Sequence, residues 1–184
     1  MTITVIKPER NNVLNCVARY DELNPVTTGL PDMHLANCQR TFLSVLGFEQ
    51  PKGEIQHSPF GNHVAARITS QPTGYGAAFV RARAGCGVLM HTHDTSECFM
   101  PIAGRWMIEW EGDKGNEHVI LNPMDFIAVP ICVQRRFECI DVPQGKDEGI
   151  LFAIISGESP AVEWSPEAVK LMSENGQSIE RVTD

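Results

Sequence analysis

The chain has 184 residues, a net charge of -8, and 42% hydrophobic and 21% charged residues, which is typical of a single globular domain with short extensions. Its 15 basic residues are scattered, and this argues against nucleic-acid binding, because phosphate contacts need clustered Lys and Arg. The sequence contains no apolar run of about 18 residues and does not begin like a secretion signal. We therefore expect a cytoplasmic protein that does not contact membranes.

The cysteines show no CxxC spacing, which would be typical of a zinc or redox motif. Disulfides are also unexpected in a cytoplasmic chain of this size. We therefore expect these residues to be small, buried hydrophobic side chains. The six positions are Cys16, Cys38, Cys86, Cys98, Cys132 and Cys139.

Residues 1–61 are predicted to form an N-terminal extension with a helix that packs on the rest of the chain. A loop rich in Asn, Pro, Thr and Gly covers residues 24–31. Apolar residues then recur at helical spacing before Gly47, namely Leu35, Phe42, Leu43, Val45 and Leu46. This period predicts a helix that ends at Gly47. Residues 51–61 contain Pro and Gly and are predicted to be a connection.

Residues 62–157 change to a period of two, with turn residues at short intervals, and predict an all-β barrel of two facing antiparallel sheets. The expected strands are Val64–Thr69, Ala77–Ala84, Val88–His93, Glu97–Ile102, Arg105–Glu111, His118–Leu121, Phe126–Val129, Arg136–Ile140 and Ile150–Ile155. Residues 158–184 are expected to form a helical tail. In this tail Ser165 is a suitable N-cap, Pro166 suits the first helical position, and Gly176 ends the helix.

One short segment carries the candidate chemistry. Side chains two apart in a strand share a face, so His91 and His93 are expected to project together. Glu97 follows a short turn and lies where the next strand can return its carboxylate to both imidazoles. Two imidazoles and one carboxylate form the facial ligand set of non-haem Fe(II) oxygenases. Two surface histidines on an edge strand would be the alternative, but this leaves Glu97 unexplained.

This spacing resembles the first motif of the cupin superfamily, with matches at Gly85, His91, His93, Glu97 and Gly104. The resemblance covers about residues 62–157. It implies a jelly-roll barrel (a double-stranded β-helix) with a divalent metal ion inside, and a homodimer. Fe(II) is favoured as the metal, and Mn, Zn or Ni would suit the same ligands. The segment from Glu163 onward is similar to the tail of uncharacterised bacterial cupins that carry arginine in their second motif.

The second cupin motif is matched only in part. Pro130 fits, whereas Met124 and Cys132 replace glycines and Arg135 replaces the histidine that would be a further ligand. Arginine stays protonated and does not bind metals. A dication and an arginine about 6 Å apart repel each other by roughly 5 kcal/mol at an effective dielectric constant of about 20.

Three roles for Arg135 remain open. Its side chain points away from the metal, or it holds an anionic substrate as a catalytic residue, or it pairs with Glu97 and replaces the metal. A strand shifted by one residue would instead present the Gln134 amide oxygen to the site.

Other residues are weaker candidates. His118 is a possible further ligand on another strand, and Arg81 a possible anion anchor. His34, His57 and His63 lie in connection-like sequence before the barrel. Trp106, Ile108 and Trp110 share one strand face and are interpreted mainly as core.

The leading functional hypothesis is a metal-dependent enzyme acting on a small organic anion, specifically a non-haem Fe(II) dioxygenase. A metal-dependent isomerase or lyase would use the same ligands. A non-enzymatic module that binds or senses a small acid, without metal, is the hypothesis from a different class, and a structural cupin with a vestigial site is the third.

Overall fold

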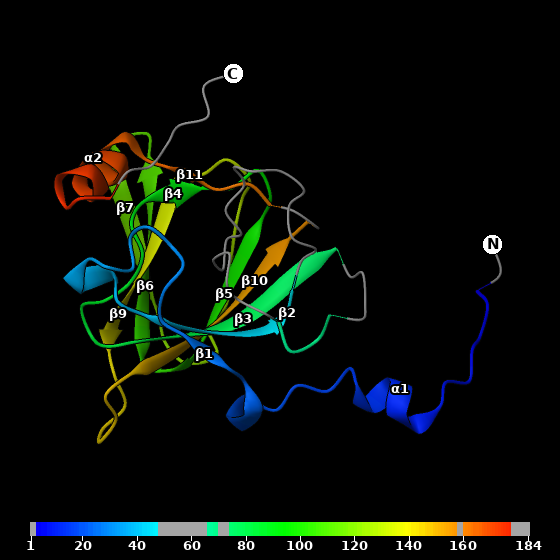
Figure 1. The fold of residues 1–184 in the computed structure, drawn as a ribbon. Coiled ribbons are helices and arrows are strands. Elements are labelled where there is room, and N and C mark those ends of the chain that lie inside the picture. Colours follow the sequence, from blue (N-terminus) through cyan, green and yellow to red (C-terminus); the bar gives the residue numbers. More distant parts are fainter. Residues whose placement is uncertain (1–2, 48–65, 70–73, 158–159, 178–184) are drawn as a thin grey trace.

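The computed structural model describes residues 3–47, 66–69, 74–157 and 160–177, and consists mainly of two antiparallel sheets (Figure 1). The six-stranded sheet has the order β1 (Pro25–Val26), β2 (Thr41–Leu46), β3 (Tyr75–Ala82), β10 (Gly149–Ser156), β5 (Glu97–Ala103) and β8 (Ile127–Val129). The five-stranded sheet has the order β11 (Glu163–Trp164), β4 (His91–Thr92), β9 (Arg135–Asp141), β6 (Arg105–Gly112) and β7 (Gly115–Leu121). The all-β jelly-roll expected from the sequence is confirmed.

The core lies between the two sheets and follows the alternation of the strands. In β10 every second side chain is buried, as the period of two predicts. Trp106 and Ile108 of β6 are fully buried. The Phe137 ring of β9 lies 5.5 Å from the Phe99 ring of β5 across the sheets, and 5.9 Å from the Trp106 ring, in edge-on arrangements that aromatic pairs favour.

Three of the six cysteines belong to this interior, so the expectation that all six are buried holds for half of them, while Cys16 and Cys98 are only partly buried. Cys38, Cys86 and Cys139 are buried, whereas Cys132 is exposed. Burial raises the pKa of the Cys38 thiol to about 12. Burial also raises the pKa of the Cys139 thiol, so Cys38 and Cys139 act as small hydrophobic side chains rather than as nucleophiles.

The helices are few and short. They are α1 (Arg10–Leu14), the two 3₁₀ turns η1 (Tyr20–Glu22) and η2 (Ala36–Cys38), and α2 (Pro166–Glu174). The α2 start is as predicted: the Ser165 hydroxyl accepts a hydrogen bond from the Ala168 amide at 3.1 Å, and Pro166 occupies the first turn. Ala168 and Met172 are buried against the barrel, so α2 packs on it. In contrast, α1 has no buried residue and stands apart from the sheets (Figure 1).

The helix predicted over residues 35–46 is wrong. Residues 41–46 form β2, which pairs with β1 on one side and with β3 on the other. Five of its six residues are buried, so the segment has no polar face to reveal a strand period. A short apolar run of this kind fits a buried strand as well as a helix, and Thr41, Phe42 and Val45 favour the strand.

Two expected strands also differ. Only His91 and Thr92 of the expected strand over residues 88–93 are paired as β4. The strand expected over residues 64–69 begins outside the described residues, and its described part makes one isolated bridge, from Ile68 to Leu46. His57 and His63 also lie outside the described residues. The division into units 1–61, 62–157 and 158–184 stays a prediction, although β1 and β2 already belong to the six-stranded sheet.

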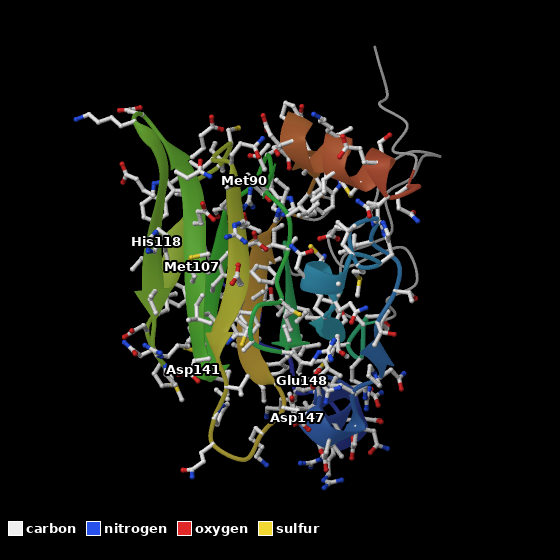
Figure 2. All side chains as sticks on the ribbon, turned by 90° about the vertical axis from the view of Figure 1, so that its left-hand side faces the viewer. Met90, Met107, His118, Asp141, Asp147 and Glu148 are labelled. Atoms are coloured by element: carbon white, nitrogen blue, oxygen red, sulfur yellow. The ribbon has the colours of Figure 1, made fainter. Side chains whose placement is uncertain are left out.

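Figure 2 shows the two ends of the barrel. Met90, just before β4, lies at one end, and Asp141, Asp147 and Glu148 lie at the opposite end. The residues described next cluster around β4 and the starts of β5 and β9. In the described part of the chain, no helix is long and apolar enough to cross a membrane.

Candidate metal centre

The structure brings together the three candidate metal ligands of the first motif. His91 lies in β4, His93 directly follows that strand, and Glu97 begins β5 in the facing sheet. One ligand atom from each residue lies within 4.8 Å of the others. All three side chains are buried, which confirms that both histidines point into the barrel. Such a buried group of two imidazoles and a carboxylate has the composition of a facial metal site.

Hydrogen bonds fix the tautomer of both histidines. His91 Nδ1 lies 2.8 Å from the Leu89 carbonyl oxygen, and His93 Nδ1 lies 2.6 Å from the Ala161 carbonyl oxygen. A carbonyl only accepts, so each Nδ1 carries the proton and donates it. The lone pair of each neutral ring is then on Nε2, as in metal sites where an outer partner orients the imidazole.

Both imidazoles are also kept neutral. Burial lowers the pKa of His91 well below its ordinary value, and the nearby His93 and Arg135 lower it further. Burial likewise lowers the pKa of His93, although the Glu97 carboxylate opposes this shift. Neutral imidazole is the form that binds a metal, so at neutral pH no proton has to be displaced from either ring.

Arg135 pairs with Glu97. Its Nε and Nη2 atoms donate to Glu97 Oε2 at 3.1 and 2.9 Å, and its Nη1 donates to the Val133 carbonyl at 3.3 Å. Arg135 begins β9 opposite His91 in β4, and its side chain is fully buried. The structure therefore shows the contact expected for the third role of Arg135. It does not show an arginine pointing away from the site, and substrate contact by Arg135 stays a prediction.

The backbone supports the alignment of both motifs. Gly85 and Gly104 of the first motif have φ angles of 80° and 77°. Met124 and Cys132, which replace the glycines of the second motif, have φ angles of 73° and 60° and are the two non-glycine residues with positive φ in the described part of the chain. All four positions thus keep the left-handed backbone that favours glycine. This agrees with the alignment that places Arg135 at the histidine position of the second motif, and its place as a ligand position stays a prediction.

A small cavity of about 30 Å³ adjoins the three candidate ligands. Besides His91, His93 and Glu97, it is lined by Arg40, by apolar side chains of both sheets, and by Val162 and Trp164 from the C-terminal segment. Arg135 is not among the described residues that line it, although its partner Glu97 is. A space of this size holds one or two water molecules or a similarly small group.

The C-terminal segment belongs to the site, which the sequence did not indicate. Ala161 accepts the His93 hydrogen bond, and its own amide donates to Asp94 Oδ1 at 2.8 Å. Trp164 pairs with His91 between β11 and β4, and the two rings lie 5.5 Å apart. The tail that the sequence assigned a packing role therefore holds one imidazole and covers the other.

A second buried ion pair, Asp32 with Arg40, was also missed. Arg40 Nη1 and Nη2 donate to Asp32 Oδ2 and Oδ1 at 2.9 and 2.8 Å. Asp32 Oδ2 also accepts from the Leu89 amide at 3.3 Å, and Leu89 is the residue whose carbonyl holds His91. The pair thus anchors the residue that orients one of the candidate ligands. No sequence motif connects Asp32 with Arg40. Recognising β2 would have placed Arg40 on the same face as Phe42, which is buried.

The other sequence candidates lie away from the site. His118 is exposed on the outer strand β7, opposite Glu109 of β6 (Figure 2). His34 is exposed as well. Arg81 pairs with Glu148 at 3.3 Å, and Figure 2 places Glu148 at the end of the barrel opposite Met90. Gln134 belongs neither to the ligand group nor to the described cavity lining.

Comparison with known proteins supports the fold. No family model and no curated protein matches the sequence. Among solved structures, oxalate decarboxylase from Lactobacillus farciminis in complex with formate has a TM-score of 0.54 and 10% identity, over 85% of this chain and 38% of that chain. A vicilin from Solanum melongena has a TM-score of 0.53 and 8% identity, over 89% and 39%. An oxalate oxidase structure has a TM-score of 0.51 and 12% identity, over 81% and 65%.

This chain spans less than two thirds of the length of each of these proteins. At identities this low, the likeness establishes architecture. Together with the two facing sheets and the left-handed motif positions, it confirms the structural part of the resemblance seen in the sequence. The chain has the fold of the cupin superfamily.

Proposed function

We propose that this chain is a metal-dependent enzyme that acts on a small organic anion, with His91, His93 and Glu97 as the metal ligands. The proposal rests mainly on the two hydrogen bonds that Nδ1–H of His91 and His93 donate to backbone carbonyls. Both histidines donate Nδ1–H to carbonyls, so two Nε2 lone pairs and a carboxylate are left beside one cavity. A structural histidine needs no such common orientation.

The donor set fits a divalent ion. Two neutral imidazoles and one carboxylate suit Fe(II), Mn(II), Ni(II) or Zn(II), and the 2-His-1-carboxylate set is typical of Fe(II) oxygenases. Bound there, the metal supplies a Lewis acid and, as Fe(II), an electron source for dioxygen chemistry. Arg135 donates two hydrogen bonds to Glu97 Oε2 and is not among the described residues that line the cavity. The negative charge of Glu97 therefore offsets the repulsion between Arg135 and a bound dication.

The charges of the site favour an anionic ligand. Arg135 with Glu97 and Arg40 with Asp32 are each neutral as pairs. Both histidines are neutral as well, so a bound dication leaves a net charge of about +2 in a buried space. A carboxylate or enolate group lowers this charge, whereas a cationic or purely apolar ligand does not.

We propose a dioxygenase as the reaction class. The 2-His-1-carboxylate set is typical of Fe(II) oxygenases, and the cavity of about 30 Å³ beside it accepts a group of the size of dioxygen. Trp164 and Val162 line the cavity, and His91, His93 and Glu97 are all buried. An isomerase or lyase would use the same ligands, and oxygen dependence separates these classes. Cytoplasmic location and a homodimer stay predictions.

Metal binding is the first test. Protein purified without chelator or affinity nickel should bind one Mn(II) or, without oxygen, one Fe(II) per chain in a titration. The double variant His91→Ala/His93→Ala should bind at least about 100-fold more weakly while staying folded, because even outer partners of a ligand are worth 10–100-fold. His118→Ala, an exposed histidine, is the matched control and should bind like the wild type. Unchanged metal content in the double variant would disprove the site.

Activity is the second test. The Fe(II)-loaded protein should consume oxygen with at least one member of a panel of small acids that includes oxalate and formate, the compounds named for two of the compared structures. Turnover without oxygen uptake, with Mn(II) or Zn(II), would instead indicate an isomerase or lyase.

The Arg135–Glu97 pair favours one further candidate, a metal-free binding module. In such a protein the ion pair satisfies Glu97, and the barrel holds a small acid without chemistry. A folded wild-type protein that binds the acid but takes up no metal at millimolar concentration would establish this function instead.

A further inference from the structure

Arg40 has a buried donor without a protein partner. Its side chain is 0% exposed, and Nε has no hydrogen-bond partner in the described part of the chain. A buried, unsatisfied N–H is destabilising by about 1–3 kcal/mol, so it calls for an explanation. Of the described buried side-chain atoms without a partner, Arg40 Nε is the one whose residue lines the cavity of the candidate metal centre.

The position of the guanidinium is set by its other contacts. Nη1 donates to Asp32, to the Cys38 carbonyl at 2.8 Å and to the Gly87 carbonyl at 3.2 Å. Nη2 donates to the second oxygen of Asp32. The group also lies over the Phe42 ring, 5.3 Å from its centroid. These contacts use the end of the guanidinium that carries Nη1 and Nη2, and they hold it rigidly.

The remaining edge has the geometry of an anion site. In a guanidinium, Nε–H and one N–H of Nη2 lie parallel on one edge and match the two oxygens of a carboxylate. Asp32 occupies the neighbouring end, so it fixes the fork without blocking this edge. Arg40 also helps to lower the pKa of His91, which places its charge near the candidate ligands.

We propose that Arg40 is the anchor of the anionic substrate, and that its Nε edge receives a carboxylate whose other contact is the metal. This deepens the proposed function, on which it rests, because it names the substrate group and the residue that selects it. A small monocarboxylate or the end of a short dicarboxylate satisfies the orphaned Nε–H and reduces the positive charge of the loaded site. Neutral ligands of equal size do neither.

Formate binding tests the proposal, because formate is the smallest carboxylate. Binding is measured by ¹³C-formate NMR on metal-free protein, and by the visible spectrum of Co(II)-loaded protein. Arg40→Lys keeps a positive charge beside Asp32 but removes the fork. Compared with the wild type, this variant should bind formate at least tenfold more weakly, both as metal-free protein and as Co(II)-loaded protein. Its affinity for Co(II) should change by less than about threefold. Arg83→Lys, the same change at an exposed arginine, is the control and should leave both unchanged.

The outcomes separate the two proposals. If the wild type binds no Co(II), the metal site fails, and the role of Arg40 is still decided by formate binding to the metal-free protein. Formate binding that is equal in the wild type and Arg40→Lys, or no formate binding in either form of the wild type, would overturn the role of Arg40. Should Arg40→Lys not fold, Asp32→Asn/Arg40→Gln removes both charges together, and the same loss of formate binding is expected.

Discussion

Two buried arginine–carboxylate pairs lie beside one cavity, and they differ in which of their atoms have no hydrogen-bond partner within the pair. Arg135 places its Nε and Nη2 on a single oxygen of Glu97, so both contacts go to Oε2. Arg40 places its Nη1 and Nη2 on both oxygens of Asp32, and its Nε remains unpartnered. The first pair presents a carboxylate to the cavity and hides its arginine, whereas the second presents its arginine and hides its carboxylate.

The difference shows how one kind of ion pair supports two tasks. A carboxylate that faces a space beside two neutral imidazoles attracts a cation. An arginine that lines the same space and has an unpartnered Nε–H attracts an anion. Each group that lines the cavity is held by a buried partner of opposite charge, so the protein can keep both inside the barrel at moderate cost in stability. The predictions that follow test this division of tasks.

Removing either arginine should produce the largest effect. Arg135→Met and Arg40→Met each leave a buried carboxylate unpaired, and each should destabilise the metal-free protein by about 3–5 kcal/mol in urea unfolding. The two variants should respond differently to Mn(II). Bound metal gives Glu97 a new cationic partner, so the stabilisation by Mn(II) should exceed that of the wild type by about 1–3 kcal/mol in Arg135→Met alone. Equal stabilisation in both variants would remove the distinction between the pairs.

Restoring the usual ligand should have the next effect. Arg135 begins β9 directly opposite His91, and Cys132 shortly before it has a positive φ angle. Arg135→His removes one positive charge and adds one imidazole, so Mn(II) affinity should rise at least tenfold, or about 1.4 kcal/mol. Arg136→His, at a residue that pairs with Glu109 and Glu138, is the control and should give no gain. No gain at position 135 would mean that this position does not reach the metal.

The histidines should make the metal-free protein sensitive to acid. Their pKa values are lowered in the folded state, so below the unfolded value of about 6.5 the unfolded chain binds protons that the folded chain does not. Stability should therefore fall as pH decreases from 7 to 5, by at most about 2.7 kcal/mol per pH unit for the two groups. His91→Asn/His93→Asn should remove most of this slope, and His118→Asn should not. A slope that is the same in all three proteins would show that the buried rings titrate normally.

The smallest effect concerns the loops that precede β8 and β9. Met124 and Cys132 adopt a left-handed backbone that is unfavourable by about 1–2 kcal/mol for a residue with a Cβ. Glycine relieves this strain but increases the freedom of the unfolded chain by about 0.4–1 kcal/mol. Met124→Gly and Cys132→Gly should therefore each stabilise the protein slightly, by up to about 1 kcal/mol in urea unfolding. Clear destabilisation would indicate that these side chains have a role of their own.

The sequence predicted most of the barrel and the ligand group, because both follow from local spacing. The period of two in residues 75–156 is a direct result of one buried and one outer face. The His91–His93 spacing within a strand sets their common direction, and the short turn returns Glu97. The position of Arg135 followed from the second motif, but its partner did not, since the sequence cannot choose between two conformations of a long side chain.

Asp32, Arg40 and the covering Trp164 could not be predicted in the same way. Their contacts with the site join residues that are far apart in the sequence, such as Asp32 with Leu89 and Trp164 with His91. The helix expected over residues 35–46 made this harder, because a helix would place Arg40 and Phe42 on different faces. Five of the six residues of β2 are buried, so its sequence shows no alternation of apolar and polar residues. The strand that directly follows Arg40 was therefore not recognised.

The central claim is that His91, His93 and Glu97 bind one metal ion. The most direct measurement is anomalous X-ray diffraction from crystals of the protein loaded with Mn(II) or, without oxygen, Fe(II). The account predicts one anomalous peak per chain, at about 2.0–2.2 Å from Nε2 of both histidines and from a Glu97 oxygen, with Arg135 still hydrogen-bonded to the carboxylate. A crystal at saturating metal with no peak in the cavity, and with the Arg135–Glu97 pair unchanged, would contradict it.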